Sequence, residues 1–162
     1  MTFSPESNRL STPPEPATVL GVPVHLLSDY VSWLEARWQQ GKGTHVVTLN
    51  AEMVMLARKN RQLANAIAQA DLIIPDGAGV ILSLNLQGKK QQRLPGIELA
   101  AALLKQMAQD KIQGEILFYG GVPGRAEAAA QYWRQQYSEL TIQAEHGYLL
   151  EEEQTSFHEQ LS

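Results

Sequence analysis

Short apolar runs typical of buried strands alternate along this chain with longer segments in which apolar residues recur at helical spacing. The strand-like runs lie at residues 44–49, 72–74, 115–119 and 140–144. The helix-like segments lie at residues 51–70, with a break expected near Asn60, and at residues 80–86, 96–111 and 123–137. Strands separated by helices of this length pair in parallel through right-handed crossovers. The pattern therefore predicts an α/β fold with a parallel sheet and helices on both of its faces.

The N-terminal part of the chain breaks this pattern. Residues 1–17 lack an apolar core and a basic start, and they hold Pro5, Pro13, Pro14 and Pro16. We expect a flexible leader over residues 1–17 and no signal peptide. Residues 19–26 predict an opening strand or a hairpin around Gly21. The remaining residues 18–162 are short enough for a single α/β domain.

Charge and composition exclude several functional classes. The formal net charge is -4 and no basic run occurs, which argues against nucleic-acid binding. The chain has no cysteine, so it can form neither a disulfide nor a thiolate metal site, and a cytoplasmic location is compatible with this. The histidines show no ligand-like spacing, and no metal is expected. No stretch approaches the ~20 apolar residues of a membrane span, so we expect membrane contact to be peripheral.

Small or polar clusters follow each strand-like run. They are residues 48–50 (TLN), 75–77 (PDG), 120–121 (GG) and 146–147 (HG). In a parallel sheet the carboxyl ends of the strands meet at one edge, which is where ligands bind in open α/β folds. Capping or turn chemistry explains each cluster singly. Together they predict a crevice lined by the Thr48 hydroxyl, the Asn50 amide and the Asp76 carboxylate.

Asp76 is the most distinctive residue at this expected edge. The run before it is rich in β-branched residues and is bounded by breakers, so a buried strand delivers one acid to a tight turn. Gly77 and Gly79 after it allow the backbone to turn sharply or to approach a ligand closely. We therefore count Gly77 among the substrate-binding candidates.

Two further segments supply groups that suit a phosphate. Residues 119–125 (YGGVPGR) follow a strand and open a helix, which presents backbone N–H groups and a positive helix end. A nucleotide cradle formed by Gly120, Gly121 and Gly124 explains this segment as well as a purely structural turn does. Arg93 precedes a Pro-Gly turn and a helix start, where it is either solvated or a fixed cation near the crevice.

Four blocks of the chain resemble, in order and spacing, the WecG/TagA/CpsF glycosyltransferases, family 26. The blocks are residues 48–50, 70–80 (ADLIIPDGAGV), 93–99 (RLPGIEL) and 118–124 (FYGGVPG). The resemblance implies a Rossmann-like parallel sheet with the active crevice at the C-terminal ends of its strands. These enzymes transfer a sugar, commonly N-acetylmannosamine or its uronic acid, from a UDP donor to polyprenyl-diphosphate-linked N-acetylglucosamine at the cytoplasmic face of the membrane.

The resemblance implies an inverting, metal-independent hexosyltransferase without a cofactor, serving cell-surface polysaccharide or teichoic acid synthesis. It makes Asp76 the general base, places Thr48 and Asn50 in the acceptor and donor pocket, and places Arg93 near the diphosphate. A carboxylate ionised at neutral pH can take the proton of an attacking sugar hydroxyl. The chain has no Asp-x-Asp motif, so Arg93 and the N–H groups of residues 120–124 are expected to stabilise the departing UDP.

The expected partners are a UDP-sugar donor, a polyprenyl-diphosphate-linked sugar acceptor and the cytoplasmic membrane face, and a homo-oligomer stays open. Family members continue for several dozen residues past the position of Tyr148, with another strand and a Gly-x-Pro-x-Gln-Glu segment. This chain ends at Ser162, so we expect a domain that lacks the family's C-terminal segment.

Two other classes of function stay open. The first is a catalytically silent module, or truncated pseudo-enzyme, that binds a UDP-sugar or a nucleotide. The second is a nicotinamide-dependent oxidoreductase. The lack of a Gly-x-Gly-x-x-Gly turn after the first strand counts against that second class.

Overall fold

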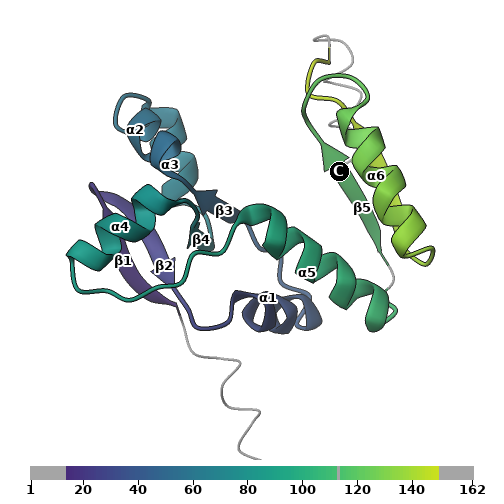
Figure 1. Ribbon diagram of the computed structural model, residues 1–162, viewed down its shortest axis with the longest axis horizontal. Helices are drawn as coiled ribbons and strands as arrows, with labels where there is room; N and C mark the ends of the chain where they lie inside the picture. The colour runs from purple at the N-terminus through teal and green to yellow at the C-terminus, as the bar shows by residue number, and fades with distance from the viewer. Residues whose placement is uncertain (1–13, 113, 150–162) are drawn as a thin grey trace, which may run out of the picture. The chain divides into compact units, whose positions relative to one another are not determined.

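A computed structural model describes residues 14–112 and 114–149 of the chain (Figure 1). Its contacts divide the chain into two units, Met1–Leu103 and Leu104–Ser162. The described residues form a mixed α/β structure with short parallel sheets, which agrees with the predicted fold class. The single domain over residues 18–162 and the Rossmann-like arrangement of one continuous sheet stay predictions.

The first unit opens with a β-hairpin around Gly21, as the sequence predicts. β1 (Glu15–Val19) pairs antiparallel with β2 (Val22–Leu26). Both turn residues have positive φ, 50° at Leu20 and 84° at Gly21, as in the tight turns that match the twist of two paired strands. Alternate residues of β2 are buried, so one face of the hairpin packs on the core.

The predicted leader is wrong at its C-terminal end. Residues 15–17 belong to β1, because they pair with residues 24–26 of β2. The proline-rich composition of the leader hid this pairing, since Pro16 lowers the strand propensity of the segment. Residues 1–13 lie outside the described residues.

A parallel pair follows the hairpin. β3 (Val46–Leu49) and β4 (Leu72–Pro75) run in the same direction, and α2 (Ala51–Ala57) and α3 (Arg61–Ala68) connect them. Asn60 caps α3, because its side-chain oxygen accepts a hydrogen bond from the N–H of Leu63 at 3.1 Å. The predicted parallel pairing and the predicted break near Asn60 are confirmed.

β4 has no exposed face. Ile73 packs into an apolar cluster that includes Val80 and Leu84 of α4 (Ala78–Leu86). Leu72 and Ile74 pack into another cluster, formed with α1 (Tyr30–Gln39) and α5 (Gly96–Gln109). Successive side chains of a strand point to opposite faces, so helices cover β4 from both sides.

The side chain of His25 joins β2 to the second edge of β4. The N–H groups of Leu72 and Asp76 donate toward the β3 side, to the carbonyls of His45 and Leu49. The N–H of Ile73 points the other way and donates to Nδ1 of His25 at 3.1 Å. Burial lowers the pKa of His25, which keeps Nδ1 available as an acceptor.

In the second unit β5 (Glu115–Tyr119) and β6 (Thr141–Glu145) form another parallel pair, connected by α6 (Arg125–Gln136). Their apolar core includes Ala130, Leu140 and Ile142. These elements lie within two residues of the predicted ones. Among the described residues of the whole chain, no helix is both long enough and apolar enough to cross a membrane.

Acid should destabilise the first unit through His25. Nδ1 accepts a bond from Ile73 only when it carries no proton, and burial lowers the folded-state pKa below the ordinary value of 6.5. The unfolded chain therefore binds the proton more strongly, so this contribution is complete above about pH 6.5 and is lost as the pH falls below it. Urea unfolding from about pH 8 down to about pH 5 measures the effect.

Two variants separate this contribution from that of other titrating groups. His25→Asn keeps a side-chain acceptor that does not titrate, so its unfolding free energy should fall less steeply with acid than that of the wild type. His25→Leu leaves the buried N–H of Ile73 unpaired and should cost about 1–3 kcal/mol at pH 8. Equal pH slopes for the wild type and His25→Asn would contradict the assignment.

Candidate active site

The carboxyl ends of β3 and β4 bring predicted site residues together. Leu49 pairs with Pro75 at the strand ends, and the N–H of Asp76 donates to the carbonyl of Leu49 at 2.8 Å. Thr48 lies within β3, and Asn50 and Asp76 are the residues that follow the two strands. The parallel register therefore sets Asn50 and Asp76 next to each other.

Asn50 connects the end of β3 to the start of α2. Its side-chain oxygen accepts a hydrogen bond from the N–H of Met53 at 2.9 Å, which caps the helix. The two hydrogens on its side-chain nitrogen are the groups that it can offer to a ligand oxygen. Capping and ligand binding use opposite ends of this amide, so Asn50 can serve both.

The Asp76 carboxylate is held by the backbone of a distant segment. Its Oδ2 accepts a hydrogen bond from the N–H of Gly96, the first residue of α5, at 3.1 Å. The side chain remains 22% exposed. The contact joins the carboxylate to the backbone at the start of α5, so it orients the carboxylate. Oδ2 is thus held by the backbone, and Oδ1 is the oxygen that faces Arg93.

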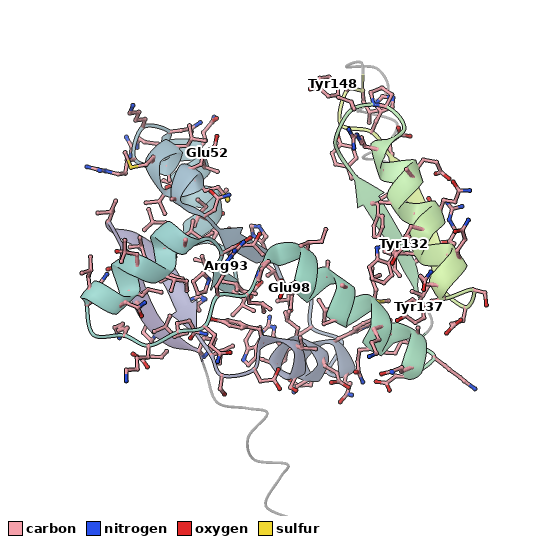
Figure 2. All side chains as sticks on the ribbon, in the orientation of Figure 1. Glu52, Arg93, Glu98, Tyr132, Tyr137 and Tyr148 are labelled. Atoms are coloured by element: carbon pink, nitrogen blue, oxygen red, sulfur yellow. The ribbon has the colours of Figure 1, made fainter. Side chains whose placement is uncertain are left out.

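Arg93 lies beside that second oxygen. Its Nε is 3.5 Å from Oδ1 of Asp76, and its side chain is 54% exposed. Figure 2 shows Arg93 on the segment that leads into α5, whose first turn carries Glu98. An exposed ion pair at this distance contributes little to stability. The contact does place a half-exposed guanidinium beside the Asp76 carboxylate.

Two glycines allow the segments of the site to approach closely. Gly77 has a φ of 99°, and a Cβ added to it would lie 3.6 Å from Cβ of Asn50. A Cβ added to Gly96 would lie only 2.9 Å from Oγ1 of Thr48. The start of α5 therefore packs directly against Thr48 and leaves no room for a side chain at position 96.

Gly96 is the site residue that sequence reasoning missed. From the sequence, Arg93 stands out in residues 92–98 and Gly96 belongs only to a turn. The sequence did carry a signal, because proline precedes this helix and has no side-chain acceptor that could cap it. In the structure the carbonyl of Pro95 accepts the N–H of Leu99 at 3.0 Å, which places Pro95 at the capping position of α5. A helix without a local cap needs an acceptor from elsewhere, and Asp76 supplies it.

The glycine-rich segment belongs to the second unit. The N–H of Gly120 donates to the carbonyl of Glu145 at 2.9 Å, and Gly147 donates to the carbonyl of Gly121 at 3.0 Å. Gly124 precedes α6 in the left-handed conformation, with φ of 85°. The Gly120 N–H is thus used in pairing the two strand ends. That Gly120, Gly121 and Gly124 share a site with Asp76 stays a prediction.

Metal ligands are not grouped at this site. Over residues 14–112 and 114–149, no group of three or more His, Asp or Glu side chains is arranged to hold a metal ion. The charged side chains at the mouth of the site are Asp76 and Arg93. This arrangement suits the removal of a proton beside a fixed positive charge.

Comparison with known proteins identifies the family that this chain resembles. The chain matches the family model described as "Glycosyl transferase WecG/TagA/CpsF family" over residues 17–162, which confirms the resemblance of the four sequence blocks. Two relatives are both named N-acetylglucosaminyldiphosphoundecaprenol N-acetyl-beta-D-mannosaminyltransferase.

The relative from Bacillus spizizenii is 38% identical over 96 residues, which cover 58% of this chain and 37% of that protein. The relative from Staphylococcus aureus is 33% identical over 119 residues, which cover 72% of this chain and 46% of that protein. The matched part of the chain thus spans less than half the length of either relative.

Replacing Gly96 should disturb the contact between α5 and β3. The new Cβ of Gly96→Ala would lie 2.9 Å from Oγ1 and 3.0 Å from Cγ2 of Thr48. We expect the free energy of unfolding to fall by about 1–3 kcal/mol, as in other overpacked sites. Adding Thr48→Ala removes both atoms and should recover most of the loss in a double-mutant cycle.

Gly43→Ala is the matched control, because a Cβ there meets nothing within 4 Å. Its effect should stay within about 0.5 kcal/mol. If the changes in unfolding free energy caused by Gly96→Ala and Thr48→Ala were additive, the predicted steric clash between the two positions would be absent.

Proposed function

The chain belongs to the WecG/TagA/CpsF family of glycosyltransferases, and we propose that it transfers an N-acetylmannosamine-type sugar from a UDP-sugar to a polyprenyl-diphosphate-linked sugar. The names of the two relatives, which describe a mannosaminyl group and a diphosphoundecaprenol-linked N-acetylglucosamine, support this substrate class. Such a reaction serves cell-surface polysaccharide or teichoic acid synthesis. The protein works at the cytoplasmic face of the membrane as a peripheral enzyme.

The observation that carries this proposal is the positioned carboxylate of Asp76. Oδ2 is oriented by the N–H of Gly96, and Oδ1 lies 3.5 Å from Nε of Arg93. Oδ1 accepts the proton of the acceptor hydroxyl while that oxygen forms a bond to the anomeric carbon of the donor. The bond from the anomeric carbon to the UDP oxygen breaks on the opposite face, so the configuration inverts and UDP leaves with the bonding electrons.

The departing UDP gains negative charge, which the site must stabilise. Arg93 supplies a guanidinium that can donate two parallel hydrogen bonds to a diphosphate. Asn50 supplies amide hydrogens, and Gly77 lets the backbone at the start of α4 come close to a ligand. Thr48 and Asn50 then shape the pocket around both sugars.

The proposal extends to the glycine-rich segment that the sequence predicts as a nucleotide cradle. In this proposal β3, β4, β5 and β6 belong to one Rossmann-like sheet, with the crevice at the carboxyl ends of the strands. Gly120, Gly121 and Gly124 would then line the same crevice as Asp76. The N–H of Gly120 is paired with Glu145, so the donors that this segment could offer a diphosphate are the N–H groups of Gly121 and Gly124. The parallel pairing within each unit supports this arrangement.

Asp76→Asn tests the general base. The amide oxygen can still accept the N–H of Gly96, so only the contribution of the charge is lost and the free energy of unfolding should fall by no more than about 1 kcal/mol. The amide cannot take a proton, so we expect turnover to fall by about 100-fold or more in an assay with UDP-N-acetylmannosamine and a short-chain polyprenyl-diphosphate-linked N-acetylglucosamine. UDP binding, measured by calorimetry, should change only a few-fold.

Asp110→Asn is the matched control, because Asp110 is an exposed carboxylate just after α5 that contacts only the side chain of Gln106 among the bonds described. Its turnover should match that of the wild type. Activity of Asp76→Asn within a few-fold of the wild type would mean that another group takes the proton. Binding of UDP-sugar by the wild-type chain without any product would indicate a silent binding module.

Arg93→Gln tests the stabilisation of the leaving group. Loss of one preorganised donor typically raises the barrier by about 3 kcal/mol, so we expect turnover to fall by about 100-fold. Arg93→Lys keeps the charge without the planar fork and should recover part of this loss. The control is Arg58→Gln, at an exposed residue that follows α2. Equal turnover of Arg93→Gln and Arg58→Gln would remove Arg93 from the mechanism.

A further inference from the structure

An apolar groove with a volume of about 300 Å³ adjoins the candidate active site in the first unit. Its walls come from α2, α4 and the turn between β1 and β2. Apart from Ser83, the lining consists of apolar residues and one glycine. The reaction proposed above places no group in this groove.

Large apolar side chains at the groove are exposed to solvent. Leu20 is 61% exposed, Met55 48%, Leu82 60% and Leu86 81%. Single exposed leucines are normal on protein surfaces, but apolar residues that gather around one groove mark a binding site. The lining of the groove therefore suits an apolar ligand.

The groove begins where the polar site ends. Ala51, which lines it, directly follows Asn50, and Gly79, which also lines it, is two residues after Gly77. A Cβ added to Gly79 would lie 3.1 Å from Cβ of Ala51, so α2 and α4 touch at their N-terminal ends beside the site. From Gly79 the lining continues along α4 to Leu86, over roughly 10 Å at 1.5 Å per residue.

We propose that this groove holds the first isoprene units of the acceptor's polyprenyl chain. The inference rests on the proposed function and adds a subsite to it. The acceptor is a charged diphosphate joined directly to an apolar chain, and the protein offers the same sequence of chemistries. Asn50 directly precedes the groove residue Ala51. Arg93 contacts Asp76 at the end of the neighbouring strand, while the leucines of α4 and the hairpin turn line the groove. Binding of the polyprenyl chain in the groove thereby orients the diphosphate, and the sugar attached to it, toward Asp76.

Binding measurements test the groove without requiring turnover. Farnesyl diphosphate and methyl diphosphate share a head group and differ in the tail, so calorimetry with each probe isolates the tail's contribution. The wild-type chain should bind farnesyl diphosphate at least about tenfold more tightly, since a few buried methylene groups suffice for this factor. The double variant Leu82→Asn, Leu86→Asn should lose most of that difference and bind methyl diphosphate like the wild type.

Leu56→Asn is the matched control, because Leu56 is a leucine of α2 that is 49% exposed and does not line the groove. It should keep the full preference for the farnesyl tail. Equal affinity of the wild type for both probes would overturn the inference, as would an equal loss of preference in Leu56→Asn and the double variant.

Two further outcomes would assign the groove to a different occupant and overturn the inference. One is self-association of the wild-type chain in sedimentation that the double variant abolishes while farnesyl preference persists. The other is adsorption to neutral phospholipid vesicles that the double variant weakens, again with farnesyl preference intact.

The transfer assay separates this inference from the proposed function. Tail-dependent binding without sugar transfer would contradict the function and leave the groove standing. Sugar transfer with the same KM for acceptors with methyl and farnesyl tails would contradict the groove and leave the function standing.

Discussion

The first unit is organised around β4, a strand whose four residues are all buried. β4 is covered by one apolar cluster through Ile73 and by another through Leu72 and Ile74. Its backbone groups need partners on both edges, because an unpaired N–H at such depth is costly. β3 satisfies one edge, and the His25 side chain satisfies Ile73 on the other. Asp76 directly follows the buried strand and is itself partly exposed.

Structure and proposed chemistry share the same carboxylate. Asp76 supplies α5 with the side-chain acceptor that Pro95 cannot provide. This contact holds the start of α5 at the end of β4, although the two are 20 residues apart in the sequence. The return brings Arg93 to the mouth of the site and packs Gly96 on Thr48. The Asp76 side chain remains 22% exposed, and its second oxygen contacts Arg93.

The site and the groove beside it present two adjacent environments, one polar and one apolar. Both helices begin just after the strand ends, α2 after Asn50 and α4 after Gly77. Their side chains then line the groove, Val54 and Met55 from α2 and Leu82 and Leu86 from α4. A substrate with a charged head and an apolar tail requires this combination. The chain belongs to a family of glycosyltransferases, and a relative is named for an acceptor of this kind, a sugar linked through a diphosphate to a lipid.

What the sequence determined by itself was local. Apolar periodicity predicted β5 and the α2–α3 break at Asn60, and a carboxylate after an apolar run predicted a site at Asp76, because these signals act within one turn or one strand. Only the tertiary structure decided that Gly96 orients Asp76, that Thr48 excludes a side chain at position 96, and that His25 completes the edge of β4. These contacts join residues that lie 20 or more positions apart, and β1 likewise starts at Glu15 because β2 pairs with it. Packing brings such partners together, and no local pattern encodes which partner a buried donor or an uncapped helix will find.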